Sequence, residues 1–334
     1  MESLLPRCLD SLIIINNLEK LEVWVVNDGS KDRSSVIGHQ YEERYPGVIN
    51  VIDKPNGNYG SCINAALPKC TGKYVKILDS DDSFDTINLI QFINDLTTST
   101  ADLIITNVIN VSAENNSFTC INVNMPANQL LKFSEAISYN DFLNIQMHSV
   151  TYRTKIFNTI EYRQTEGISY TDQEWIFHPM IAVSNVIYYP YTIYRYLIDR
   201  QGQTMDPKVF LRTQNHQIES QKRRIFVYEN NKDVINKENR EFLLHKITQS
   251  IYVLYKRLLT QDVTRADELL ATYDAIIKEY SPELYNLSAT MDYDPIIGYK
   301  FIEKWRNNKS RSLPLNIRLK LFFNRFLQSV KSQH

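Results

Sequence analysis

Apolar residues in the first hundred positions alternate between two spacings. Some runs carry nearly unbroken Val, Ile and Leu, which is typical of strands buried on both faces, and the runs between them have helical spacing. The expected strands are 21–28, 47–55, 72–79 and 101–111. The expected helices are 5–15, 34–45, 60–70 and 86–99. Strands that alternate with helices predict an α/β sandwich with a mostly parallel sheet.

The pattern changes along the rest of the chain. From about residue 115 to residue 200, short strand-like and helix-like stretches are mixed, and after Pro207 the apolar spacing is helical and charges are frequent. We therefore expect an α/β domain over 1–205 and a helical C-terminal region over 206–334.

The stretch 313–331 has the pattern of an amphipathic helix. One helical face collects Leu315, Leu319, Phe322, Phe326 and Val330, and basic residues lie around the rest. Such a helix either binds anionic lipid at a membrane surface or packs its apolar face on its own domain. Both interpretations stay open at this point.

Composition excludes several classes of protein. The 334 residues have a net charge of −1, so no basic excess points to nucleic acid. The 4 cysteines form no CxxC pair and no metal-ligand spacing, which indicates reduced thiols in the cytoplasm. No signal peptide and no apolar stretch of about 20 residues is present in the sequence. We expect a cytoplasmic protein, either free or peripheral to the inner face of the plasma membrane.

Three carboxylates, Asp79, Asp81 and Asp82, lie within four positions at the end of the expected strand 72–79. A capping turn explains one or two of them but not three. Clustered carboxylates repel one another, and a hard cation such as Mg²⁺ or Mn²⁺ cancels that repulsion. Such a cation fills its shell with phosphate oxygens, so the cluster predicts a site for a cation and a nucleotide diphosphate.

Two earlier loops lie where the same crevice is expected. "VVNDGSKD" (25–32) ends a strand, and "KPNGNYGSCINAAL" (54–67) leads into a helix. Asn-Asp-Gly-Ser is ordinary turn chemistry, but Asp28 at the carboxyl end of a strand could also accept hydrogen bonds from a nucleoside. The second loop is either a capped helix start or a backbone cradle for phosphate.

Together with "YTDQEW" (170–175), these motifs resemble the inverting family 2 glycosyltransferases of GT-A fold, over residues 1 to about 200. The resemblance implies metal-dependent transfer of a sugar from a nucleotide-diphospho-sugar to an acceptor hydroxyl with inversion. A UDP-sugar is the default donor and Mn²⁺ or Mg²⁺ the cofactor. The acceptor would be a glycan, a lipid-linked molecule or a protein, in cell-surface polysaccharide or glycoconjugate synthesis.

The resemblance also implies roles for residues on the donor side. Asp28 would contact the nucleoside and Asp79 the ribose, while Asp81, the last residue of the DxD motif, would bind the metal. Asn56 and Asn64 would belong to the donor-binding loop. Asp82 receives no role from the resemblance.

On the acceptor side, Asp172 would be the general base, because a positioned carboxylate must take the proton of the attacking hydroxyl. A helix N-cap is the other interpretation of this residue. Arg200 would stabilise the leaving diphosphate. Tyr152, Tyr170 and Trp175 are candidates for the floor of a sugar site, although a core position is favoured for Trp175.

The chain departs from the family pattern at three places. The family's opening strand has no counterpart before residue 5, and its absence is expected to expose ladder edges. Ile63 stands where an arginine is usual, and Thr171 where a glutamate is usual. These departures keep a second hypothesis open, a non-catalytic protein that binds nucleotide or glycan. A nucleotidyltransferase is a third and weaker hypothesis.

Overall fold

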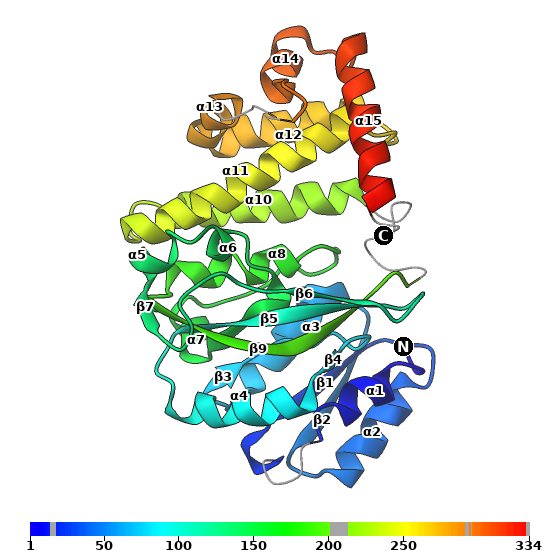
Figure 1. The fold of residues 1–334 in the computed structure, drawn as a ribbon, viewed down its shortest axis with the longest axis vertical. Helices are drawn as coiled ribbons and strands as arrows, with labels where there is room; N and C mark the ends of the chain where they lie inside the picture. The colour runs from blue at the N-terminus through cyan, green and yellow to red at the C-terminus, as the bar shows by residue number, and fades with distance from the viewer. Residues whose placement is uncertain (14–17, 201–212, 291–293, 295, 332–334) are drawn as a thin grey trace. The chain divides into compact units, whose positions relative to one another are not determined.

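The computed structural model describes residues 1–13, 18–200, 213–290, 294 and 296–331, with side chains up to 324 (Figure 1). Contacts divide the chain into two compact units. The first unit comprises 1–209 and 230–243, and the second comprises 210–229 and 244–334. This grouping adds 230–243 to the N-terminal part, and the expected division into domains 1–205 and 206–334 stays a prediction.

The first unit begins with a small parallel sheet. Strands β1 (Val23–Asp28) and β2 (Ile49–Lys54) pair in register from Val23 opposite Ile49 to Asp28 opposite Lys54. Helix α2 (Ser34–Arg44) connects them, and the Asp32 carboxylate accepts a hydrogen bond from the amide of Ser34 at its start. Among the described strands, β1 pairs with β2 alone, so its other edge carries no described ladder.

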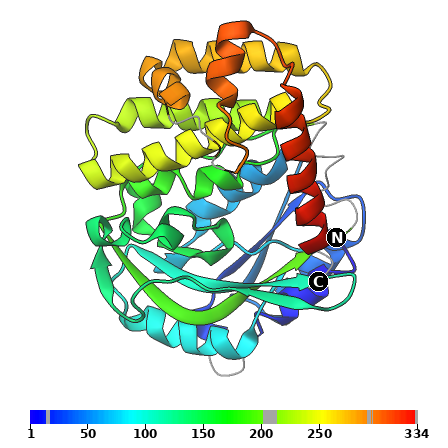
Figure 2. The same ribbon diagram turned by 45° about the horizontal axis from the view of Figure 1, so that its top comes forward.

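A second sheet of 7 described strands carries the rest of the unit. Its main order is β3-β8-β5-β9-β4, with β6 paired to β5 and β7 paired to β9. The strands are β3 (Tyr74–Val75), β4 (Ser83–Phe84), β5 (Leu103–Ser112), β6 (Phe118–Ile121), β7 (Leu130–Lys132), β8 (Val150–Arg153) and β9 (Asn185–Ile198). The long strands β5 and β9 run side by side in both views (Figures 1 and 2).

The pairings in this sheet are more mixed than the sequence predicts. β5 and β9 are parallel, but every other described pair in the sheet is antiparallel. The reason is visible at β6, which follows β5 after a short turn at 113–117 and must therefore run back along it. The expected strand 72–79 also shortens to β3, because only Tyr74 and Val75 pair with a described neighbour.

The core of the first unit lies on both sides of β5. Helices α1 (Leu5–Asp10) and α4 (Thr86–Thr98) contribute Leu9 and Phe92 to a cluster that includes Ile104 of β5. Asp85 caps α4 by accepting a hydrogen bond from the amide of Asn88. The short helices of this unit are α3 (Asn58–Ala66), α5 (Phe133–Ala136), α6 (Asn140–Leu143), α7 (Lys155–Thr159) and α8 (Asp172–Trp175). Four 3₁₀ turns are η1 (Leu18–Lys20), η2 (Leu67–Lys69), η3 (Met147–Ser149) and η4 (His178–Ile181).

The C-terminal part is helical, as the sequence predicts. Its helices are α10 (Gln214–Asn231), α11 (Lys237–Thr260), α12 (Ala266–Tyr280), α13 (Pro282–Thr290), α14 (Phe301–Asn308) and α15 (Leu315–Lys331). Within the second unit, Arg306 stacks its guanidinium 3.6 Å from the centre of the Tyr285 ring and donates from Nε to Asp274 at 2.7 Å. No helix among the described residues is long and apolar enough to cross a bilayer.

Candidate functional site

The carboxylate loop, residues 79–82, joins the end of the expected third strand to β4. Asp82 is fully buried, and each of its carboxylate oxygens accepts a hydrogen bond at 2.7 Å. The donors are the Tyr194 hydroxyl and the Leu197 amide, both on β9. Asp82, which the resemblance left without a role, therefore ties the loop to the long central strand.

Two carboxyl groups of this loop are hard to ionise. Burial, together with the charges of Asp82 and Asp81, raises the pKa of Asp79 to about 8. Burial likewise raises the pKa of Asp82 to about 7, although hydrogen bonds from Leu197 and Tyr194 oppose the shift. A cation placed between these groups would remove the repulsion that the structure leaves in place.

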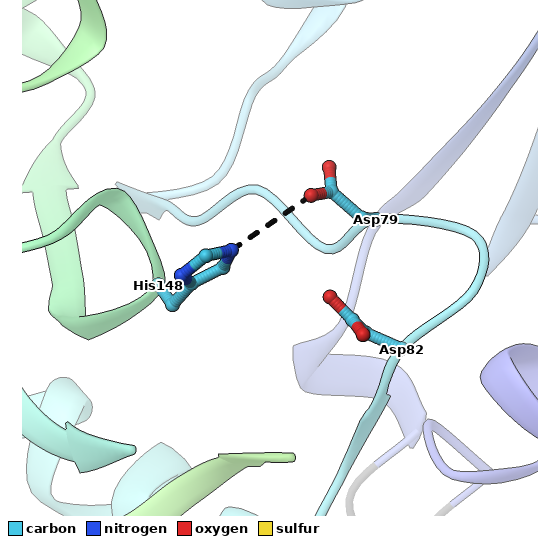
Figure 3. A group of neighbouring side chains, drawn as sticks. All are labelled: Asp79, Asp82 and His148. Atoms are coloured by element: carbon cyan, nitrogen blue, oxygen red, sulfur yellow. Dashed lines mark ion pairs between the residues drawn. The ribbon is translucent and has the colours of Figure 1, made fainter. Parts of the chain in front are cut away.

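His148 completes a group of potential metal ligands (Figure 3). Its Nε2 lies 3.9 Å from Oδ2 of Asp79, and one ligand atom from each of Asp79, Asp82 and His148 falls within 4.8 Å of the others. The imidazole stacks on the ring of Tyr196, with centroids 4.3 Å apart, and contacts Tyr194. Burial and the charge of Lys76 lower the pKa of His148 to about 4, so the ring is neutral and can ligate.

Lys76 fixes the segment that carries His148. Its Nζ donates to the carbonyl oxygens of His148 and Val150, at 2.7 and 3.1 Å. Burial lowers the pKa of this ammonium group to about 7. Sequence reasoning missed both residues. A lysine inside the apolar run "YVKILD" was the available signal for Lys76, whereas the single "MHS" histidine offered none.

Asp81 is the predicted metal ligand and Arg200 the predicted contact of the diphosphate. The two side chains form an ion pair. The Arg200 Nη2 atom is 2.5 Å from Oδ2 of Asp81, and Arg200 follows the end of β9. Arg7 donates to the backbone oxygen of Asp81, also at 2.5 Å. The structure thus brings two predicted residues into contact, with Asp81 outside the group formed by Asp79, Asp82 and His148.

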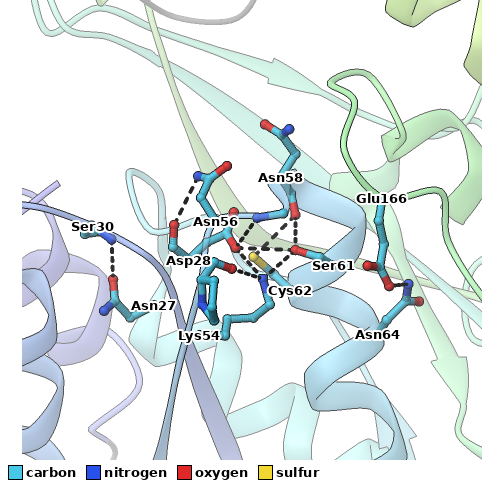
Figure 4. A network of polar contacts seen from close by, with 12 residues as sticks. Asn27, Asp28, Ser30, Lys54, Asn56, Asn58, Ser61, Cys62, Asn64 and Glu166 are labelled. Atoms are coloured by element: carbon cyan, nitrogen blue, oxygen red, sulfur yellow. Dashed lines mark hydrogen bonds and ion pairs between the residues drawn. The ribbon is translucent and has the colours of Figure 1, made fainter.

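Asp28 lies at the carboxyl end of β1 within a network of polar contacts (Figure 4). Its Oδ1 accepts from Nζ of Lys54 at 2.5 Å and from the Gly57 amide at 2.9 Å, while Asn56 donates to its backbone oxygen at 3.1 Å. Burial, the largest single influence, would raise the pKa of Asp28, but the hydrogen bonds from Lys54 and Gly57 and the charge of Lys54 together outweigh it and lower the pKa. Asp28 is therefore a fixed carboxylate.

The donor-side loop is locked to the segment 164–167. Asn64 donates to the backbone oxygen of Gln164 at 2.8 Å and to Glu166 at 2.7 Å, and its Oδ1 accepts from the Gln164 amide at 2.9 Å. Gly60 allows this approach, because a Cβ there would lie 2.0 Å from the carbonyl oxygen of Thr165. The observed contacts of Asn64 are with protein groups, and its contact with a donor stays a prediction.

Asp172 is the first residue of α8, so its interpretation as a helix N-cap is wrong. The cap residue is Thr171, and its side chain makes no capping hydrogen bond. Burial is the main cause of the raised pKa values of Tyr59 and Asp79, and the charge of Asp172 adds to both shifts. Its neighbour Glu174 is buried and accepts a hydrogen bond from the Thr165 amide at 2.9 Å.

The aromatic candidates for a sugar site divide differently from the prediction. Trp175 is fully buried and stacks on Phe157 with centroids 4.7 Å apart, which confirms the core position. Tyr152 is also fully buried and donates its hydroxyl to the Trp175 carbonyl at 3.0 Å, so its assignment to a sugar floor is wrong. Tyr170 is partly buried and has a positive φ of 65°.

Comparison with known families gives a match over the region that carries this geometry. Residues 2–158 match the family described as "Glycosyl transferase family 2". The resemblance to family 2 that the motifs indicate is thus confirmed for residues 2–158. The carboxylate loop and the Asp28 network both lie within this matched region.

Curated relatives resemble this chain over a shorter stretch. The uncharacterized glycosyltransferase MG025 homolog of Mycoplasma pneumoniae is 40% identical over 83 residues, which is 24% of this chain and 27% of that protein. The minor teichoic acid biosynthesis protein GgaB of Bacillus subtilis is 34% identical over 83 residues, 25% of this chain and 9% of that protein. The alignments thus span about a quarter or less of each relative.

Solved structures show the fold of this chain. TarS 1-349 of S. aureus, crystallised in complex with UDP-GlcNAc, has a TM-score of 0.65 at 13% identity, over 92% of this chain and 89% of that one. A second crystal structure of TarS 1-349 has a TM-score of 0.63 at 15% identity, with the same coverage of both chains. These likenesses confirm the expected GT-A type of α/β fold with a C-terminal helical region.

Proposed function

We propose that this glycosyltransferase moves a sugar from a UDP-sugar to an acceptor hydroxyl with inversion of configuration. The proposal rests on the loop 79–82. Its Asp79 and Asp82 carboxyl groups have raised pKa values, its Asp81 is paired with Arg200, and the charge of Asp172 acts on Asp79. This arrangement supports the proposal of a cation, a diphosphate and a general base at one site. The UDP-GlcNAc in the complex with TarS supports a UDP-linked donor.

The residues around the loop fit a divalent cation, Mn²⁺ or Mg²⁺. Asp79 and Asp82 are raised in pKa because buried like charges meet, and His148 offers a neutral nitrogen within reach. Both Asp82 oxygens already accept hydrogen bonds, so we propose that Asp82 attracts the cation by its negative charge and does not bind it directly. Asp81 remains the proposed ligand on the diphosphate side, with Asp79 and His148 beside it. When bound, the cation would neutralise charge on the departing diphosphate.

The protein groups divide the remaining work. Asp172 takes the proton of the acceptor hydroxyl as that oxygen attacks the anomeric carbon, and Arg200 donates hydrogen bonds to the diphosphate as its bond to the sugar breaks. Asp28 and Asn56 face the nucleoside. For Asp79 the ribose contact remains the proposed role, and one carboxylate oxygen suffices for it while the other faces His148.

The wider setting is also a proposal. Relatives such as the teichoic acid protein GgaB support a role in cell-surface polysaccharide or glycoconjugate synthesis. The acceptor would be a glycan, a lipid-linked molecule or a protein on the cytoplasmic side of the membrane. We expect no nucleic-acid partner, because the net charge is −1.

Calorimetric titration of UDP tests the donor site. The wild-type protein should bind UDP in the presence of Mn²⁺ and bind it much more weakly in EDTA. Asp81→Ala should lose the dependence on Mn²⁺, whereas Asp172→Ala should keep it. Metal-dependent binding that survives in Asp81→Ala would remove that residue from the metal site. Binding of UDP without any sugar transfer would instead favour the non-catalytic hypothesis.

A further inference from the structure

Helix α15 exposes a row of large apolar side chains. Relative to full exposure, Leu315 is 70%, Leu319 49%, Phe322 65% and Phe323 59% accessible. Positions 315, 319 and 322 are separated by four and three residues, so they lie on one face of the helix. Burying these side chains in an apolar medium would be favourable.

The helix has a second apolar face, which is already in use. Ile317 and Leu321, which belong to the second unit like the rest of the helix, are only 4% and 9% exposed. The Nζ of Lys320 donates to the backbone oxygen of Ile297 at 2.9 Å and fixes the helix on the same unit. A helix that only packs on its own domain needs one apolar stripe, so the exposed row is available for a second contact.

The charge around this row has one sign. From residue 304 to the end, the sequence contains no Asp or Glu and carries Lys304, Arg306, Lys309, Arg311, Arg318, Lys320, Arg325 and Lys331. Arg306 and Lys309 are paired with Asp274, but Arg318 is exposed at the border of the apolar row. Two copies of this face would bring like charges together, whereas an anionic surface would neutralise them.

We infer that the face of α15 formed by Leu315, Leu319, Phe322 and Phe323 docks on an anionic lipid surface. The leucine and phenylalanine side chains would enter the boundary between headgroups and acyl chains, and the flanking basic residues would contact the anionic headgroups. In the sequence, Phe326 and Val330 continue the same spacing. The inference does not depend on the proposed sugar transfer, which concerns residues of the first unit.

Co-sedimentation of the full chain with vesicles tests the inference. The protein should bind vesicles of phosphatidylcholine with phosphatidylglycerol, not vesicles of phosphatidylcholine alone, and binding should weaken as salt is raised. The double variant Phe322→Ser/Phe323→Ser should bind the anionic vesicles at least roughly tenfold more weakly than the wild type. Ile87→Ser is the matched control, because Ile87 is 81% exposed on α4, and its binding should equal that of the wild type.

Two further readouts keep the result interpretable. Circular dichroism and Mn²⁺-dependent UDP binding of the double variant should match the wild type, so that a loss of lipid binding reflects the surface alone. Equal binding to both kinds of vesicle, or unchanged binding by the double variant, would overturn the inference. So would a dimer in light scattering that the double variant abolishes, because the partner of this face would then be a second copy.

Discussion

At the scale of single residues, the carboxylate loop separates three aspartates that the sequence presents as equals. Asp82 is hydrogen-bonded to β9, Asp79 faces His148, and Asp81 forms an ion pair with Arg200. Their surroundings differ because the turn at 79–82 points each side chain to a different neighbour. Each assignment therefore predicts a different effect of mutation.

Asp82→Asn should destabilise the fold. An asparagine can accept one of the two hydrogen bonds from Tyr194 and Leu197, but its amide group then meets the second donor. We expect a loss of about 1–3 kcal/mol in the free energy of unfolding, measured with denaturant in the presence of EDTA. Asp81→Asn, at a partly exposed position, is the control and should be close to the wild type. Equal stability of the two variants would contradict the structural role of Asp82.

The raised pKa values of Asp79 and Asp82 predict how stability depends on pH. Both groups keep their protons in the folded metal-free protein up to about pH 7–8 but lose them near pH 4 when unfolded. The free energy of unfolding should therefore fall as pH rises from 5 to 8 in EDTA. Millimolar Mn²⁺ should restore stability more at pH 8 than at pH 5, as thermal melts would show. A stability that rises with pH in EDTA would refute this reasoning.

His148→Ala should weaken the binding of Mn²⁺ in the presence of UDP by roughly tenfold. Removing the imidazole takes away the one nitrogen near Asp79 in the described group of potential ligands, and titration calorimetry measures the loss. His39→Ala is the control, because His39 also contacts two carboxylates, Glu42 and Asp53, but lies on α2. An unchanged Mn²⁺ affinity in His148→Ala would leave the metal to carboxylates alone.

At the scale of elements, α3 and the segment 164–167 act as one piece. Asn64 bonds to Gln164 and Glu166, and the Gly167 amide donates to the Gly57 carbonyl at 2.8 Å. Because Glu174 of α8 holds Thr165, the same contacts link the donor-side loop to the helix that begins with Asp172. This linkage joins both halves of the proposed reaction.

Gly60→Ala should break that linkage. The added Cβ would lie 2.0 Å from the backbone oxygen of Thr165, so the segment must move. We expect about 1–3 kcal/mol of destabilisation and a marked loss of transfer activity. Gly72→Ala, whose Cβ would meet nothing closer than 3.4 Å, is the control for stability. A Gly60→Ala protein with wild-type stability and activity would show that the two segments are independent.

Elements with strong local signals could be predicted from the sequence. The capped helix α4 and the apolar strand β5 fall within a residue or two of their predicted bounds. The strand predicted at 72–79 did not, because regular pairing depends on a neighbour that a local pattern cannot specify. The same limit hid His148, which reaches the carboxylate loop only through the pairing of β8 with β5 and β3.

At the scale of the whole molecule, the α/β class and the helical C-terminal part were predictable, and the likeness to TarS confirms the fold. The mixed pairing of the larger sheet was not, because strands such as β4 and β7 join it through contacts distant in sequence. The three-carboxylate motif pointed to the candidate site, whose function stays a proposal. It could not indicate which aspartate is structural, since burial and hydrogen bonds decide that.

Sugar transfer with Asp172 as the base is the central claim. Release of UDP from a UDP-sugar in the presence of an acceptor measures this transfer directly. With Mn²⁺, the wild-type protein should release UDP and form a product of inverted configuration. Asp172→Asn should bind UDP as the wild type does and lose at least about a hundredfold in transfer rate. Transfer by Asp172→Asn at the wild-type rate, or a product of retained configuration, would contradict the account.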